Sequence, residues 1–320
     1  MVRISAYILA ADPAWIEASV LSYYDLVDRI VVSYDADSLG WTGVPIHVEQ
    51  CLGRLRAIDR NGKFEYRPGH FARSDFFDRP MENDTHQRQV ALNQASDGAD
   101  WVLQFDTDEV LGAPEIFYDC IQNADREQFG AVDFPARWLY RQLGGDRFLE
   151  ACRSFWSVMA GFPGPVAVKA FTPLRLARQC DTRPYRVDFR SKNSDPWHPR
   201  GTPVHRSIKQ SQGIFHFSMI RDEESLRRKT ETFSHARDLN WNTEIDHWCW
   251  CGRHPYLAAA SGLFVRGKST GLYRRGLRLT RVRLPQQIAG LNANDGGENP
   301  RMPSTSCASL VAPSRAGSPT

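Results

Sequence analysis

The sequence has no run of about 18 consecutive apolar residues, so we expect no membrane-spanning helix. Cysteines are few and odd in number, seven in 320 residues, which disfavours a disulfide framework and favours a reducing, cytoplasmic setting. The net charge of +3 is too small to indicate a nucleic-acid partner by itself, and we expect none. Asp12 interrupts the apolar N-terminal stretch, which we therefore interpret as a core strand and not as a signal peptide.

A strand, a helix and a second strand are predicted at the start of the chain. Residues 3–10 are mostly apolar, residues 14–27 carry apolar side chains at helical spacing, and residues 30–32 are apolar again. Asp12 is the expected N-cap of the helix. Such a βαβ unit implies a parallel sheet, so we predict an α/β fold with a Rossmann-like, mostly parallel sheet flanked by helices. Ligand sites of these sheets lie at the carboxyl ends of the strands, where residues 33–42 follow the second strand.

The rest of the chain predicts more elements of the same kind and a change of composition near the C-terminus. Asp222 is the expected N-cap of a late helix. The further expected elements are a third strand at 44–48, an extended piece at 63–66, helices at 83–95, 114–123 and 222–238, strands at 100–105, 131–138 and 213–220, and irregular structure with short strands over 139–205. The expected domains are a catalytic domain at 1–220, a helical, basic extension at 221–284 and a disordered tail at 285–320.

The motif FDTDEVL, residues 105–111, follows the apolar run of the strand expected at 100–105. Asp106 and Asp108 are one residue apart, a spacing that lets two carboxylates share a divalent cation such as Mg²⁺ or Mn²⁺. A bound cation would also act as a Lewis acid on a nucleoside diphosphate leaving group. The pair therefore predicts a metal-dependent site for a nucleotide sugar.

Two other interpretations of this motif remain open. An apolar run followed by D-x-D-x-V-L is also the nucleophile motif of haloacid-dehalogenase-like phosphatases, in which Asp106 would attack phosphorus and Asp108 would serve as acid and base. That family carries the motif near its N-terminus and needs a later acidic pair. The cluster could also be an ordinary solvated group of acids in a non-catalytic module at a membrane surface.

Three stretches of the sequence resemble GT-A glycosyltransferases, close to family 2. ISAYILAADPAWIEASVLSYYDLVDRIVVSYDADSLGWTG resembles the opening of the family. RQVALNQASDGADWVLQFDTDEVL resembles the helix and strand that lead to its metal-binding D-x-D. GIFHFSMIRDEESLRRKTETFSHARD resembles an H-F-S…K…S-H segment of N-acetylglucosaminyltransferase-related bacterial enzymes. These stretches cover about half the chain. One departure is Leu39, where the family often has Asp after the residue equivalent to Ser38.

The resemblance implies a sugar transfer from a nucleoside diphosphate sugar to a carbohydrate or lipid-linked acceptor, with Mn²⁺ or Mg²⁺ and with inversion favoured over retention. It implies metal ligation by Asp106, Asp108 and His216, although His216 could also be a packed strand histidine. The implied nucleotide-sugar-binding residues are Ala10, Asp35, Ser38, Arg88, Asp106 and Lys229.

The base that deprotonates the acceptor is not selected by the sequence. An inverting transferase needs such a group, usually a carboxylate. The candidates lie in the region expected to be irregular or beside it: Asp146, Glu150, Asp188 and Asp195.

Residues 265–283 carry seven Lys or Arg residues and no acid, interleaved with apolar residues. Such a segment could contact an anionic membrane surface, could be a solvated helix or could bind nucleic acid. We favour peripheral contact with the inner face of the membrane, where lipid-linked acceptors would be found.

Overall fold

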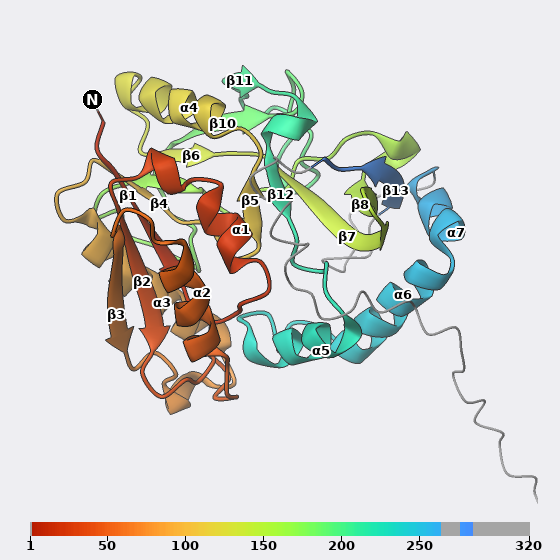
Figure 1. Ribbon diagram of the computed structural model, residues 1–320. Coiled ribbons are helices and arrows are strands. Elements are labelled where there is room, and N and C mark those ends of the chain that lie inside the picture. The colour runs from red at the N-terminus through yellow and green to blue at the C-terminus, as the bar shows by residue number, and fades with distance from the viewer. Residues whose placement is uncertain (1, 264–275, 284–320) are drawn as a thin grey trace, which may run out of the picture.

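The computed structural model describes residues 2–263 and 276–283 and contains two sheets (Figure 1). The larger sheet has eight strands in the order β11-β10-β6-β9-β4-β1-β2-β3. Every pair of neighbours is parallel except those of β9, which runs antiparallel to β4 and β6. The strands are β1 (Ile4–Leu9), β2 (Arg29–Asp35), β3 (Phe64–Gly69), β4 (Trp101–Leu103), β6 (Ala131–Asp133), β9 (Ala167–Lys169), β10 (Pro184–Asp188) and β11 (Arg206–Ser207).

Both faces of the central strands are buried, which is why β1 and β2 are apolar along most of their length. On one face, Ile8 and Val32 pack in the same cluster as Leu52 and Leu55 of α2. On the other face, Tyr7 and Val31 pack with Leu92 of α3 and its neighbours. The helices are α1 (Ile16–Leu21), α2 (Val48–Ile58), α3 (Pro80–Ser96) and α4 (Pro114–Arg126), and α4 contacts β6 and β10.

A smaller, mixed sheet has five strands in the order β13-β8-β7-β12-β5. Three helices follow one another along one side of the molecule, and α6 packs on β7 (Figure 1). These elements are β5 (Glu109–Leu111), β7 (Ala136–Gly144), β8 (Arg147–Cys152), β12 (Ile214–His216), β13 (Gly276–Arg281), α5 (Glu223–Thr232), α6 (Trp241–Arg253) and α7 (Pro255–Ala260). Short 3₁₀ turns are η1 (Tyr24–Leu26), η2 (Ser74–Phe76), η3 (Ser154–Trp156), η4 (Gln210–Gln212) and η5 (Ser261–Leu263).

The predicted fold class is confirmed: a mostly parallel sheet flanked by helices, starting with a βαβ unit. The late helix also begins as expected, since the Asp222 carboxylate accepts a hydrogen bond from the Ser225 amide at 2.8 Å. Asp12 does not cap α1, whose N-cap position is Trp15, because Asp12 instead accepts from the Ala14 amide in the preceding turn.

Two predicted elements were wrong. The third strand expected at 44–48 is a loop that runs into α2, because the apolar residues Cys51, Leu52 and Leu55 continue at helical spacing. The single strand expected at 131–138 is divided between β6 and β7, which belong to different sheets. The extension expected at 221–284 contains the helices α5, α6 and α7, and it also contains strand β13, which pairs antiparallel with β8. The domain limits stay a prediction, and the tail predicted at 285–320 lies outside the described residues.

Candidate functional site

A cavity of about 470 Å³ opens at the carboxyl ends of β1, β2 and β4. Leu9 and Ala10 line it from the end of β1, Asp35 from the end of β2, and Asp106 and Asp108 from the loop after β4. Carboxyl ends of parallel strands meet at one edge of a sheet, and this is where such folds bind ligands. Residues from α3, α5, β7 and β12 and from the segments 162–163, 177–179 and 197–198 also line it.

The structure brings together the predicted binding residues from segments that are far apart in the sequence. The predicted residues that line the cavity are Ala10, Asp35, Arg88, Asp106, Asp108, His216 and Lys229. Ser38 lies in the loop after β2 but is not part of the lining. Asp35 is buried and also stabilises that loop, since its carboxylate accepts hydrogen bonds from the backbone amides of residues 37, 39, 71 and 72.

The candidates for the catalytic base do not line the cavity. Glu150 is buried and held by Arg137 and Arg278. Asp188 accepts hydrogen bonds from the amide and hydroxyl groups of Ser194, and Asp146 lies in the turn between β7 and β8. Asp195 is buried and pairs with a histidine that does line the cavity. Direct proton abstraction by any of the four carboxylates is therefore not supported.

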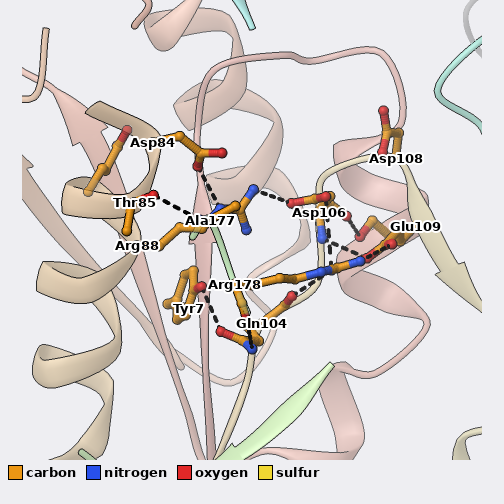
Figure 2. Close-up of polar contacts among 12 residues, drawn as sticks. Tyr7, Asp84, Thr85, Arg88, Gln104, Asp106, Asp108, Glu109, Ala177 and Arg178 are labelled. Atoms are coloured by element: carbon orange, nitrogen blue, oxygen red, sulfur yellow. Dashed lines mark hydrogen bonds and ion pairs between the residues drawn. The ribbon is translucent and has the colours of Figure 1, made fainter. Parts of the chain in front are cut away.

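Asp106 is held by two arginines (Figure 2). Arg88 Nη2 donates to Asp106 Oδ1 at 2.7 Å, and its Nε donates to Asp84 Oδ1 at 2.6 Å. Arg178 Nη1 lies 3.9 Å from Asp106 Oδ2. Burial alone would raise the pKa of Asp106, but the two guanidinium groups outweigh it and lower the pKa to about 2. Asp106 is therefore ionised and a very weak base at neutral pH.

Asp108 is buried among three cationic or protonatable side chains. Lys229 Nζ from α5 forms an ion pair with Asp108 Oδ2, and Arg221 Nη2 lies 3.3 Å from the same oxygen. His216 Nε2 of β12 is 3.3 Å from Oδ1. Burial opposes ionisation, yet these neighbours hold the pKa of Asp108 well below its usual range. Burial alone would also lower the pKa of His216, but Asp108 raises it overall.

Glu109, the third acid of the motif, has a structural partner. Arg178 donates to both of its carboxylate oxygens, at 2.6 and 2.5 Å, and both side chains are at most 2% exposed. Glu109 Oε2 also accepts from the Asp106 amide at 3.0 Å. Arg178 lies in a loop whose Ala177 has a positive φ of 47°. The pair thus holds residues 177–179, which line the cavity, against the acidic motif (Figure 2).

The predicted metal ligands have suitable donor atoms but are not arranged as a metal site. Asp106 points to Arg88, and Asp108 is engaged by Lys229 and Arg221 as well as by His216. Within residues 2–263 and 276–283, no group of three His, Cys, Asp or Glu side chains is close enough together to hold a metal ion. Mn²⁺ or Mg²⁺ stays a prediction.

Several residues of the site were missed from the sequence. Asp84 lies four residues before Arg88, so helical spacing could have placed both on one face of α3. Arg221 follows the H-F-S segment and pairs with both Asp12 and Asp108. Arg178 had no signal, because it lies in the stretch without periodicity and meets Glu109 only through the fold.

Two further predictions concern membranes. No helix in the described part of the chain is long and apolar enough to cross a bilayer. Of the basic run 265–283, only residues 276–283 are described, and most of them form β13. Membrane contact through this run stays a prediction.

No family model matches the sequence, and no curated protein matches it. Among solved structures, a 4-diphosphocytidyl-2C-methyl-D-erythritol synthase from Anaerococcus prevotii matches 52% of this chain and 70% of its own, at 16% identity and a TM-score of 0.29. A mannose-6-phosphate isomerase from Helicobacter pylori matches 52% of this chain and 60% of its own, at 10% identity and a TM-score of 0.26. A mannose-1-phosphate geranyltransferase from Thermus thermophilus matches 53% of this chain and 50% of its own, at 10% identity and a TM-score of 0.28. These low similarities assign neither a family nor a function.

Proposed function

We propose that this protein is a GT-A-like glycosyltransferase that moves a sugar from a nucleoside diphosphate sugar to a carbohydrate or lipid-linked acceptor. The observation that supports it most is the meeting of Asp35, Arg88, Asp106, Asp108 and Lys229 at one cavity. They come from four separate segments, β2, α3, the loop after β4 and α5, and the resemblance implied each of them as a nucleotide-sugar or metal contact. The cavity volume of about 470 Å³ suits a ligand of this size.

One part of the lining suits a nucleoside, and another part suits phosphate groups. Near the ends of β1 and β2, Leu9, Leu39, Ile46 and Trp41 offer an apolar and aromatic surface for a base. Trp41 is fixed by a hydrogen bond from its indole N–H to Gln87 at 2.7 Å. Stacking on an aromatic face suits any base, so this surface does not select one.

Arg88, Lys229 and Arg178 form the basic part of the lining. Fixed cations in a partly closed site stabilise the charge that develops on a diphosphate leaving group, and they need no reorganisation at the moment of reaction. The ion pairs with Asp106 and Asp108 hold these cations in place before the ligand binds. A bound diphosphate would be a second anion beside each ion pair. Arg88 and Lys229 would then contact both the diphosphate and their carboxylate partners.

The function is tested by incubation with UDP-glucose, UDP-N-acetylglucosamine and GDP-mannose, alone and with Mn²⁺ or Mg²⁺. A transferase releases UDP or GDP, with water as the slow acceptor when no sugar acceptor is added. A phosphatase that uses Asp106 and Asp108 would instead release inorganic phosphate from a simple phosphoester. A non-catalytic module would release neither product, and that result would contradict the proposal.

One lysine variant and one arginine variant on α5 make this test more specific. Lys229→Met removes a cation that lines the cavity, so we expect at least tenfold weaker binding of the nucleoside diphosphate. Arg228→Met is the matched control, because Arg228 is the preceding residue, is 43% exposed and pairs with Glu224 outside the cavity. Equal affinity in both variants would remove Lys229 from the proposed diphosphate site.

A further inference from the structure

One wall of the cavity carries a histidine that is oriented by a buried carboxylate. His198 lines the cavity and its side chain is 40% exposed. Its Nδ1 is hydrogen-bonded to Asp195 Oδ2, and Asp195 is only 1% exposed. A carboxylate at Nδ1 fixes the ring orientation and keeps the proton there, which leaves Nε2 with a free lone pair. No hydrogen bond from His198 Nε2 to another described residue is formed.

The groups around Asp195 hold it in place. Asp195 accepts from the Trp197 amide at 2.9 Å and lies 3.6 Å from Arg186. The same guanidinium is 3.2 Å from Asp133, so two buried carboxyl groups share one arginine. The flanking cations Lys192 and Arg200 are exposed to solvent, which screens them.

The carboxylates that line the cavity are all engaged by other groups. Asp106 pairs with Arg88, and Asp108 pairs with Lys229 and Arg221. Asp12 pairs with Arg221, and Asp35 accepts from four backbone amides. Burial raises the pKa of Asp84, but its side chain is only 1% exposed and pairs with Arg88.

Two other histidines line the cavity. His216 is occupied by Asp108 and lies beside Lys229. His235 pairs with Asp238, but that carboxylate is 56% exposed, so the pair is solvated and weakly held. Among these three histidines, His198 is therefore the one whose ring is oriented by a buried carboxylate and which is not engaged by the acidic motif.

We propose that His198 is the general base that deprotonates the acceptor hydroxyl, and that Asp195 is its positioning residue. The hydroxyl proton passes to Nε2 of His198 while the hydroxyl oxygen bonds to the anomeric carbon. The bond from that carbon to the diphosphate oxygen breaks, and its electron pair leaves with the diphosphate. The imidazolium, stabilised by Asp195, then returns its proton to solvent. This step rests on the proposed glycosyltransferase function.

Neighbouring contacts place His198 on a wall that continues to the acidic motif. Its ring lies 6.2 Å from Phe162, which also lines the cavity. Gly161 precedes Phe162 and lies against Trp138, where a Cβ would come within 2.1 Å of the indole nitrogen. Trp138 in turn lies 5.8 Å from His216, the partner of Asp108. An acceptor bound along this aromatic wall would lie between His198 and the diphosphate site.

The test compares His198→Gln with wild type in two assays: calorimetric binding of UDP and GDP, and release of UDP or GDP from the nucleotide sugars named above. We expect nucleotide affinity within twofold of wild type, and kcat lower by about 10²- to 10⁴-fold. His70→Gln is the matched control and should keep the wild-type kcat, because His70 is exposed, pairs with Asp37 and does not line the cavity.

Two more variants separate catalysis from structure. Imidazole added to His198→Ala should restore part of the rate, since the site is open to solvent, and a merely structural histidine would show no such rescue. Asp195→Asn should lower kcat while the KM for the nucleotide sugar stays within twofold of wild type, because the ring loses the carboxylate that orients it. A wild-type kcat in His198→Gln would overturn the base assignment while leaving the function intact. Wild-type protein that binds no nucleoside diphosphate would overturn both.

Discussion

The buried pair between Glu109 and Arg178 gives a sharp prediction for stability. Replacing Glu109 by Ala leaves the Arg178 guanidinium, 2% exposed, without its bidentate partner, and it also removes the acceptor of the Asp106 amide. Removing one member of a buried ion pair costs about 3–5 kcal/mol, because the remaining charge is desolvated without compensation. We expect Glu109→Ala to lower the free energy of unfolding by that amount.

Equilibrium urea unfolding, followed by tryptophan fluorescence, measures this effect. The double variant Glu109→Leu with Arg178→Met removes both charges, so it should lose less than half of what the single variant loses. Glu224→Ala is the control, because its pair with Arg228 is exposed and is worth about 0.5 kcal/mol or less. A free energy of unfolding for Glu109→Ala within about 1 kcal/mol of wild type would refute the reasoning. A double variant with a lower free energy of unfolding than Glu109→Ala would also refute it.

Other predictions concern acid stability and packing. The pKa of Asp106, lowered to about 2, means that its stabilising pair with Arg88 is complete above about pH 4 and is lost as pH falls toward 2. The stability difference between wild type and Asp106→Asn should therefore narrow over that interval, and a difference independent of pH would count against the pair. Gly161→Ala should destabilise the fold by about 1–3 kcal/mol, because its Cβ would collide with Trp138 at 2.1 Å. Gly53→Ala in α2 meets no atom within 4 Å and should instead stabilise by about 0.5–1 kcal/mol, and equal urea midpoints for both glycine variants would contradict this packing.

The start of the fold was predictable because its signals are local. The apolar runs of β1 and β2, the helical spacing between them and the cap at Asp222 depend on residues that are near one another in the sequence. The strand expected at 44–48 failed because five apolar-rich residues do not distinguish a strand from the first turn of a helix. The division between β6 and β7 follows from sheet topology, which no local pattern encodes.

The candidate site was predictable only in part. Asp106, Asp108 and Arg88 lie in or near one motif, and the resemblance to a known family indicated their chemistry. Their charge balance was not predictable, because Arg178 and Arg221 reach the motif from segments about 70 and 110 residues away. The proton acceptor was sought among carboxylates, whereas the structure places Asp195 behind His198.

Calorimetric titration of the full chain with UDP and with GDP, first with Mn²⁺ and then with EDTA, tests the proposed nucleotide site most directly. We predict saturable binding of one of them with one ligand per chain, and at least tenfold weaker binding to Lys229→Met. Loss of binding in EDTA would show that the predicted metal takes part in nucleotide binding. Equal binding in EDTA would show that the protein's own cations bind the diphosphate without a metal. Binding of neither nucleotide would contradict the proposed function.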